Sequence, residues 1–374
     1  MTADSVALVG AYHTPIQGSI LDRKLEDVIF AAAKGALADA KIRIDDIDAI
    51  VIATDDQVHG RVIESMVVAG AVGAVHRDLT TVASAGEHAL VYGYLRLLAG
   101  QGRKVLCLAW GKPSESKSPI HAELVSAEPF LLRSFGMANA VAAGLQANAY
   151  MARFGIDEGA VTQLRERRQQ SGLTAHGWTR QWAASDDRVV AWPLTGADLP
   201  ASCDAVAAAV IMTEAVIDAD QPAAWIQGVG WSTSDYNLGS RDLSQFDALA
   251  SAADRAWNGD AHRDADVVEL VEISTVGGFA AYESLGMAPL GEGSVIAGAA
   301  GVHVNPSGGN LAAHPGNAAG FMRLLTAAQQ VRGQAGATQI EPKPHTAVGA
   351  TLHGFAGQGS VVMRFGAEKE LARA

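Results

Sequence analysis

Two short patterns occur twice in the sequence, in the same order. DIDAIVI at residues 46–52 is matched by DADVVEL at residues 264–270, and YLRLL at residues 94–98 is matched by FMRLL at residues 321–325. In both places the second pattern belongs to a helical stretch that is followed by an apolar strand. A shared order of similar segments is typical of an internal duplication. The sequence therefore predicts one α/β unit that is present twice.

Apolar strands alternate with helical segments along most of the chain. SVALVGAY at residues 5–12 is apolar on both faces, and residues 25–40 carry apolar side chains at helical spacing. Strands of this kind, separated by helices, indicate a buried parallel or mixed sheet that is covered on both sides. We expect an N-terminal half at residues 1–220 and a C-terminal half at residues 221–374, with a helical excursion within the first half at residues 112–199.

Composition excludes several classes of protein. The 374 residues carry a formal net charge of −12, which argues against general nucleic-acid binding. No apolar run reaches the roughly 18–20 residues that a membrane helix needs, and the N-terminal stretch has the pattern of a strand and not of a secretory signal. We therefore expect a cytoplasmic protein. The two cysteines, Cys107 and Cys203, lack metal-ligand spacing, and their apolar neighbours favour burial.

Two glycine-rich motifs near the C-terminus resemble motifs of a known family. VNPSGGNLAAHPGNAAG at residues 304–320 and LHGFAGQGS at residues 352–360 are similar to motifs of the thiolase superfamily, closest to its sterol-carrier-protein type. Four further segments extend the resemblance over nearly the whole chain: IDDIDAIVIAT, AYMARFGIDEGAVTQLRERRQQSG, WPLTGADLPASCDAVAAAVIMTEA and DVVELVEISTVGGFAAYESLGM. The resemblance implies duplicated βαβαβαββ halves in a five-layered α-β-α-β-α core, a helical loop domain, a dimer, and a ligand attached to coenzyme A.

The chemistry that the resemblance implies is Claisen condensation or its reverse. A cysteine at the N-terminus of a buried helix takes the acyl group, and backbone N–H groups and the helix dipole lower the pKa of its thiol. Counting back three residues from Gly86 gives Ala83 at this position, and a methyl group cannot be acylated. We interpret Ala83 as a degenerate nucleophile position. The adjacent Ser84 is either a shifted nucleophile or an ordinary helix-start residue.

Two further positions depart from the family pattern. The second cysteine of the family, which moves the α-proton, corresponds to His353. A histidine there either transfers a proton near neutral pH or fills a vacated pocket. The family histidine that helps to bind the thioester oxygen corresponds to Val271, which we interpret as a degenerate position. Glu272 follows, where the family has an acid.

His314 matches the histidine of the family's GHP-like motif, with Ala313 in place of the first glycine. It acts either as a base or as a partner of the thioester oxygen, or it only satisfies local backbone groups. The neighbouring motifs supply candidates for ligand-binding loops, whose glycines either let the backbone approach a ligand or serve as turn residues. These candidates are Asn305, Gly308, Gly309 and Gly357.

His88 follows Glu87 directly at the start of a predicted helix. Adjacent helical residues point about 100° apart, so this pair alone does not form an acid–base site. We expect His88 to face solvent or another subunit.

Three arginines in the predicted loop domain are candidates for binding the CoA phosphates: Arg165, Arg167 and Arg168. Guanidinium groups suit phosphate oxygens, and Arg180 and Arg188 lie downstream. The alternative is a solvated charged face. Trp178 and Trp182 either pack against adenine or belong to the core of the loop domain. No nucleotide-binding loop, HExxH motif or CxxC pair occurs. We therefore expect no metal and no covalently bound cofactor, with coenzyme A as part of the substrate or ligand.

Two functions of different kinds remain. The first is cleavage or formation of a C–C bond in a CoA thioester, of the retro-aldol type, without a cysteine nucleophile and with His314 and His353 as acid or base. The second is a non-catalytic thiolase-fold subunit that binds acyl-CoA or completes a hetero-oligomer. The resemblance implies a homodimer or heterodimer and, in this branch, a small partner with an OB-fold and a zinc ribbon. Ordinary acyl-CoA acetyltransferase activity is expected least, because residues that act as a unit do not replace one another.

Overall fold

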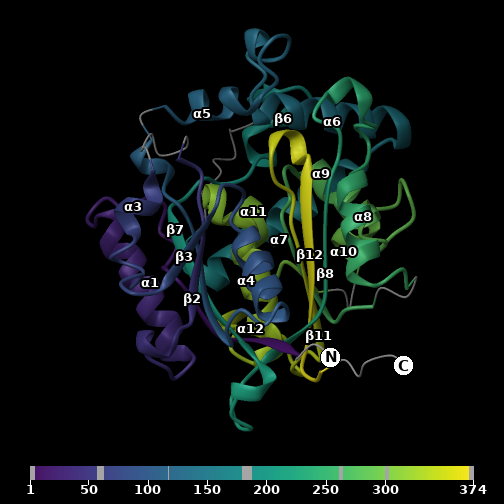
Figure 1. The fold of residues 1–374 in the computed structure, drawn as a ribbon. Helices are drawn as coiled ribbons and strands as arrows, with labels where there is room; N and C mark the ends of the chain where they lie inside the picture. The colour runs from purple at the N-terminus through teal and green to yellow at the C-terminus, as the bar shows by residue number, and fades with distance from the viewer. Residues whose placement is uncertain are drawn as a thin grey trace.

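The computed structural model describes residues 5–56, 63–116, 118–178, 188–260, 264–299 and 303–369. Ten strands in these ranges form one continuous sheet (Figure 1). They are β1 (Val6–His13), β2 (Ala49–Ala53), β3 (Asp78–Val82), β4 (Lys104–Gly111), β7 (Ala205–Thr213), β8 (Ala224–Thr233), β9 (Val267–Leu270), β10 (His303–Val304), β11 (Thr346–Ala350) and β12 (Gly359–Gly366).

The strand order shows that the sheet consists of two equivalent halves. The first half runs β3-β2-β4-β7-β1 and the second runs β10-β9-β11-β12-β8. In each half the first three strands are parallel and the last two are antiparallel to their neighbours. The halves meet where β1 pairs with the beginning of β8 over two residues. The predicted duplication of an α/β unit is confirmed.

Helices cover both faces of this arrangement and also fill its middle. None of the helices in the described ranges is both long and apolar enough to cross a membrane. They are α1 (Leu25–Asp39), α3 (Glu64–Val68), α4 (His88–Leu98), α5 (Pro119–Ser126), α6 (Asn139–Phe154), α7 (Glu158–His176), α8 (Asp247–Ala256), α9 (Thr275–Ser284), α10 (Ser294–Gly298), α11 (Gly309–Ala312) and α12 (Ala319–Arg332).

Five layers result, and Figure 1 shows them from left to right. Helix α1 packs on the outer face of the first half-sheet, and α8 packs on the outer face of the second. Between the half-sheets lie α4 and α12, in one apolar cluster that includes Cys107 of β4 and Phe365 of β12. Helix α12 is buried on nearly all sides, as a helix in a central layer must be. The predicted five-layered thiolase fold is confirmed.

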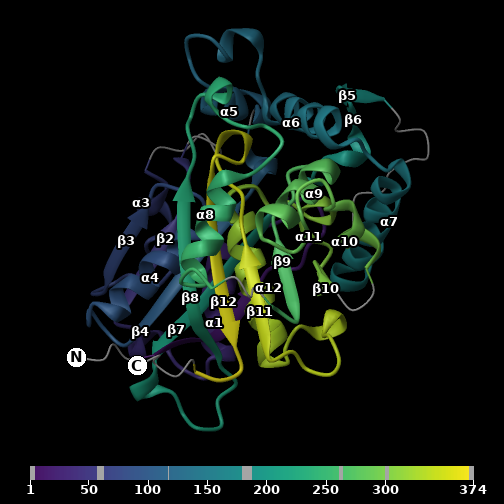
Figure 2. The ribbon, with the colours of Figure 1, turned by 90° about the vertical axis from the view of Figure 1, so that its right-hand side faces the viewer.

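The segment between β4 and β7 lies outside the layers. It contains α5, α6, α7 and a small hairpin of β5 (Val189–Ala191) and β6 (Leu194–Thr195). Figures 1 and 2 show α5 and α6 across the upper end of the sheets, with α7 descending beside the second half-sheet. The helices of this segment therefore border the end of the molecule at which α4 begins.

Candidate active site

The turn between β3 and α4 holds the position of the missing nucleophile. Ala83 lies in this turn with its side chain exposed. The N–H of Gly86 donates to the carbonyl oxygen of Asn317 at 2.9 Å, and the amide nitrogen of Asn317 lies 3.4 Å from the carbonyl oxygen of Ser84. The turn is therefore packed against the loop that precedes α12, in which His314 also lies.

His353, in the turn after β11, is held at the start of α4 by a buried carboxylate. Its Nδ1 lies 2.8 Å from Oε1 of Glu87. Glu87 is 1% exposed, whereas 18% of the His353 side chain is accessible, so the imidazole is the outer member of the pair. A Cβ at Gly320 in α12 would collide with the Glu87 carboxylate, so the close packing of α12 against Glu87 requires glycine there.

The Glu87 carboxylate is ionised although it is buried. Burial opposes its charge, but the charge of His353 and the hydrogen bond to it outweigh burial and lower the pKa of Glu87. An ionised carboxylate only accepts hydrogen bonds, so Nδ1 of His353 is the donor. This hydrogen bond fixes the orientation of the imidazole ring.

His88 lies beside this pair. Its ring contacts the His353 ring edge-to-face, with 4.8 Å between the ring centroids, and its Nδ1 lies 3.2 Å from Oγ of Ser84. Burial lowers the pKa of His88, although the Glu87 carboxylate opposes this shift. His88 is half-buried, so the expectation that it faces solvent or another subunit stays a prediction. Its contact with His353, which belongs to another segment, could not be predicted from the helix alone.

We refer to Glu87, His88 and His353 as the histidine–glutamate cluster. Each side chain offers one atom of the metal-ligand type, and the three atoms lie within 4.8 Å of one another. The second carboxylate oxygen of Glu87, Oε2, is buried and has no hydrogen-bond partner in the described ranges. One carboxylate and two imidazoles at this spacing can move protons or hold a cation.

His314 occupies the loop between α11 and α12. Its Nδ1 lies 3.0 Å from the amide nitrogen of Asn310, which is a donor, so Nδ1 accepts and Nε2 carries the hydrogen. Burial and the charge of Arg323 lower the pKa of His314 to about 4. The imidazole is therefore neutral at pH 7. Backbone hydrogen bonds with Ala201 and Cys203, at 2.7 and 3.1 Å, hold this loop in place.

Val271 directly follows β9, and its side chain is buried in the apolar cluster of the second half. Its N–H donates to the carbonyl oxygen of Ala350 at 3.0 Å. The side chain has no polar atom with which to bind a thioester oxygen. The interpretation of Val271 as a degenerate position stays a prediction.

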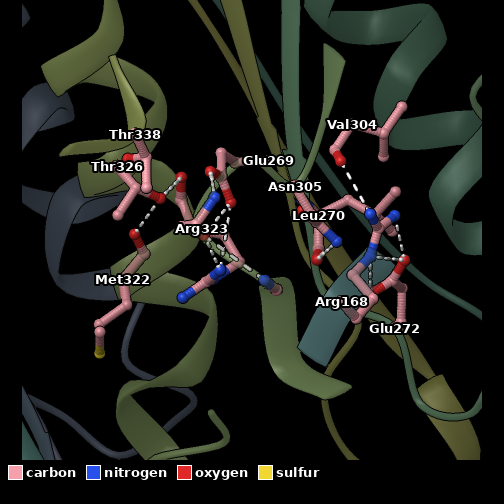
Figure 3. Close-up of polar contacts among 12 residues, drawn as sticks. Arg168, Glu269, Leu270, Glu272, Val304, Asn305, Met322, Arg323, Thr326 and Thr338 are labelled. Atoms are coloured by element: carbon pink, nitrogen blue, oxygen red, sulfur yellow. Dashed lines mark hydrogen bonds and ion pairs between the residues drawn. The ribbon is translucent and has the colours of Figure 1, made fainter. Parts of the chain in front are cut away.

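Arg168 forms a buried ion pair, which Figure 3 shows. Its Nη2 lies 2.8 Å from Oε1 of Glu272, and neither side chain is more than 5% accessible. The same guanidinium donates to the carbonyl oxygen of Val304 and to the hydroxyl of Tyr282. These partners take up most of its donors, but Arg168 also lines a surface cavity beside α7, so its contact with a CoA phosphate stays a prediction.

The other two candidate arginines are also engaged, but less completely. Arg165 forms an ion pair with the buried Asp198 at 2.6 Å, with 28% of its own side chain accessible. Arg167 donates to the carbonyl oxygen of Ala297 and lines a surface cavity of about 300 Å³ between α7 and residues 337–340. The lining of that cavity includes neither His314 nor His353. Arg180 and Trp182 lie outside the described residues.

The loop candidates make contacts within the protein. The side-chain amide of Asn305 bonds both the N–H and the carbonyl oxygen of Leu270, at 2.6 and 3.0 Å (Figure 3). Gly308 has a φ of +90°, and a Cβ there would lie 2.6 Å from the backbone nitrogen of Gly172 in α7. Gly309 and Gly357 also have positive φ values. These residues shape the loops, and their contact with a ligand stays a prediction.

Neither cysteine is a substitute nucleophile. Cys107 lies in β4 and Cys203 just before β7, and both are buried, as the sequence predicts. Burial raises the pKa of both thiols, that of Cys203 to about 12. Neither is therefore a thiolate near neutral pH.

The structure thus joins three predicted positions that the sequence could not connect: Ala83, His314 and His353. The Ala83 turn touches the His314 loop through Asn317, and the residue after Gly86 in that turn, Glu87, binds His353. Sequence reasoning missed the role of Glu87 because its partner lies 266 positions away. The available signal was an acidic residue directly before a helix that is mostly apolar.

Comparisons with known proteins agree with the fold. Residues 230–364 match the family described as "Thiolase C-terminal domain-like". The chain is 28% identical to the benzoylsuccinyl-CoA thiolase subunit BbsB of Thauera aromatica over 174 residues, 44% of this chain and 45% of that protein. It is 25% identical to an acetyl-CoA acetyltransferase of Methanothermobacter thermautotrophicus over 364 residues, 90% of this chain and 93% of that protein.

A solved structure named Ltp2-ChsH2(DUF35) aldolase superposes with a TM-score of 0.80 over 98% of both chains, at 18% sequence identity. At that identity the similarity concerns the fold. The chain therefore has the fold of the thiolases, and its residues 230–364 are similar to the thiolase C-terminal domain.

Proposed function

We propose that this protein cleaves a β-hydroxyacyl-CoA by a retro-aldol reaction that uses no cysteine nucleophile. The observation that carries the proposal is the hydrogen bond between His353 and the buried Glu87, next to the turn that contains Ala83. A carboxylate that fixes an imidazole through Nδ1 and leaves Nε2 free is a common arrangement for a general base.

In the proposed reaction, Nε2 of His353 takes the proton from the β-hydroxyl group. The C–O bond becomes a carbonyl, the bond between the α- and β-carbons breaks, and its electron pair forms the enolate of the thioester. The imidazolium of His353 then returns the proton to the α-carbon. The products are an aldehyde or ketone and a shortened acyl-CoA, and no acyl-enzyme forms.

The enolate oxygen needs a hydrogen-bond donor, and Val271 offers none. We assign this role to His314, because its Nδ1 accepts from Asn310 and Nε2–H remains available. A neutral imidazole can donate without transferring its proton. Asn317, three residues along the same loop, contacts the Ala83 turn, which supports a common site.

The names of the relatives fit a CoA thioester as the substrate. Two curated relatives are named for benzoylsuccinyl-CoA and acetyl-CoA, and one protein of similar fold is named an aldolase. We propose CoA-phosphate contacts for Arg165 and Arg167, and ligand contacts for the loops that contain Asn305, Gly308, Gly309 and Gly357. We also propose a dimer of the thiolase type in the cytoplasm.

The second candidate is a non-catalytic subunit that binds acyl-CoA. This candidate is favoured because the side chains of Ala83 and Val271 carry no polar group, and because one relative is itself named a subunit. The aldolase of similar fold is named together with a DUF35 partner. A small OB-fold and zinc-ribbon protein is therefore the partner that we propose for either function.

The test is cleavage of β-hydroxyacyl-CoA substrates by the purified protein, alone and with the partner that copurifies from its native host. Release of the carbonyl product and of acyl-CoA is followed by mass spectrometry. We expect cleavage that is lost in His353→Ala and retained in His345→Ala, because His345 is exposed at the opposite end of β11. Binding of acyl-CoA without cleavage, with or without the partner, would favour the non-catalytic subunit.

A further inference from the structure

The histidine–glutamate cluster contains one more polar side chain than the proposed general base needs. Glu87 and His353 complete the proposed base by themselves, and His88 is left without a role in the reaction. Yet His88 contributes the third atom of a group that spans no more than 4.8 Å. One carboxylate and two imidazoles also form a common protein ligand set for zinc at sites with an open position.

We infer that Glu87, His88 and His353 bind a divalent transition-metal ion such as Zn²⁺, and that the bound ion blocks His353 and inhibits the protein. The metal-binding part stands on the geometry of the cluster alone. The inhibitory part rests on the proposed function, because it assumes that His353 is the base.

The spacing of the cluster is close to what a tetrahedral ion requires. With Zn–N and Zn–O bonds of about 2.0–2.2 Å, neighbouring ligand atoms lie about 3.3 Å apart. Nδ1 of His353 and Oε1 of Glu87 are 2.8 Å apart, and one ligand atom from each of the three residues lies within 4.8 Å of the others. Side-chain rotations that shorten the widest gap would bring the three atoms to ligand spacing.

A second observation points to a cation. Oε2 of Glu87 is a buried carboxylate oxygen without a hydrogen-bond partner in the described ranges, and Glu87 is 1% exposed. This oxygen packs against Gly320 of α12, where a Cβ would collide with it. A buried acceptor without a partner is costly, and an ion that engages both oxygens of Glu87 would supply a partner of the required sign. The imidazoles of His88 and His353 are only half-buried, which leaves a path for an ion.

The surroundings of His88 also suit a ligand. Its Nδ1 lies 3.2 Å from Oγ of Ser84, so Nε2 is the nitrogen that remains for an ion. Histidine ligands of metals generally have their second ring nitrogen hydrogen-bonded in this way, which orients the ring. Ser84 therefore acts as a positioning residue for the site.

Inhibition follows because one of the three proposed ligands, His353, is also the proposed base. An imidazole nitrogen that coordinates a metal ion has no lone pair left to take a proton. The proposed base needs a hydrogen bond from Nδ1 of His353 to Glu87 and a free lone pair on Nε2. An ion that binds either ring nitrogen removes one of these two. The ion and the substrate proton therefore compete for His353.

Metal binding is measured without any assay of activity. Tag-free full-length protein is titrated with Zn²⁺ in a calorimeter and with Co²⁺ in a spectrophotometer, where tetrahedral coordination gives a characteristic visible absorption. We expect one ion per chain, and affinity that falls more than about tenfold in His88→Ala and in Glu87→Gln, as loss of even an outer-shell partner costs that much. His345→Ala should bind like the wild type. Ser84→Ala removes no ligand, so we expect its Zn²⁺ affinity to fall less than that of His88→Ala. Such a loss would support the role of Ser84 in positioning His88.

Inhibition is then measured as the ratio of cleavage rates with and without Zn²⁺ within each variant, so that basal activity does not enter. We expect this ratio to be lowest in the wild type and closer to one in His88→Ala. Equal Zn²⁺ affinity in the wild type and His88→Ala, or no binding, would overturn the inference. Stimulation of cleavage by Zn²⁺ would overturn its inhibitory part. If the protein binds Co²⁺ but cleaves no substrate, the metal site stands and the proposed function is refuted.

Discussion

His353 and Glu87 lie 2.8 Å apart, although 266 positions separate them in the sequence. The hydrogen bond joins the turn after β11 in the second half to the beginning of α4 in the first. Each half of the duplicated fold therefore supplies one member of the same acid–base pair. Because Glu87 is buried and His353 is partly accessible, the pair has a buried inner member and an accessible outer member.

Replacement of Glu87 by glutamine tests whether it orients His353. Glutamine retains the shape of the side chain but removes the charge that fixes the imidazole. We expect kcat for β-hydroxyacyl-CoA cleavage to fall about 10–100-fold, with KM little changed, because a carboxylate that orients a functional imidazole contributes about that much. Steady-state kinetics measure both constants. Glu87→Asp should recover part of the rate, and an unchanged kcat in Glu87→Gln would contradict the role.

Replacement of Ala83 by cysteine tests the degenerate nucleophile position. If this turn retains the geometry of a nucleophile-bearing helix start, a thiol at residue 83 will be acylated by an acyl-CoA. Intact mass spectrometry should show an adduct on Ala83→Cys and none on the wild type. A stable adduct on the wild-type protein, for example on Ser84, would show that the acyl-enzyme route is open after all.

The buried pair of Arg168 and Glu272 is expected to stabilise the fold. Removal of one partner leaves an uncompensated buried charge, so Glu272→Ala should lower the free energy of unfolding by about 3–5 kcal/mol. Chemical denaturation measures this change. The matched control is Asp45→Ala, which breaks the exposed pair with Arg77 and should cost no more than about 1 kcal/mol. Similar losses in the two variants would contradict the structural role of the buried pair.

Stability should fall as the pH drops below about 6.5. Burial lowers the pKa of His176 to about 3 and that of His314 to about 4, so both are neutral in the folded state. The unfolded chain binds protons at these histidines below about pH 6.5, while the folded chain does not until much lower pH. Unfolding is therefore favoured progressively between about pH 6.5 and pH 4, and these groups contribute no dependence above that range.

Denaturation midpoints measured at several pH values between 7.5 and 4 test this dependence. The double variant His176→Asn and His314→Asn should show a shallower decline than the wild type, because asparagine does not titrate. Parallel declines in the two proteins would show that other groups control acid stability.

The sequence predicted the fold well because its signals are periodic and repeated. Two patterns in the same order sufficed to predict the duplication, and the glycine motifs located Ala83 and His353 by their positions. The contact between His353 and Glu87 was not predictable, since no spacing within one segment encodes it. The burial of Arg168 was not predictable because α7 is polar around most of its circumference, so no apolar stripe shows which arginine faces inward.

The central claim is C–C cleavage by His353 without a covalent intermediate. A single-turnover reaction with a β-hydroxyacyl-CoA tests it most directly, with the released carbonyl compound and the intact mass of the protein measured at the same time points. We predict product release by the wild type with an unchanged protein mass, and no product from His353→Ala. Product formation that persists in His353→Ala, or an acyl adduct that appears and decays as product forms, would contradict the account.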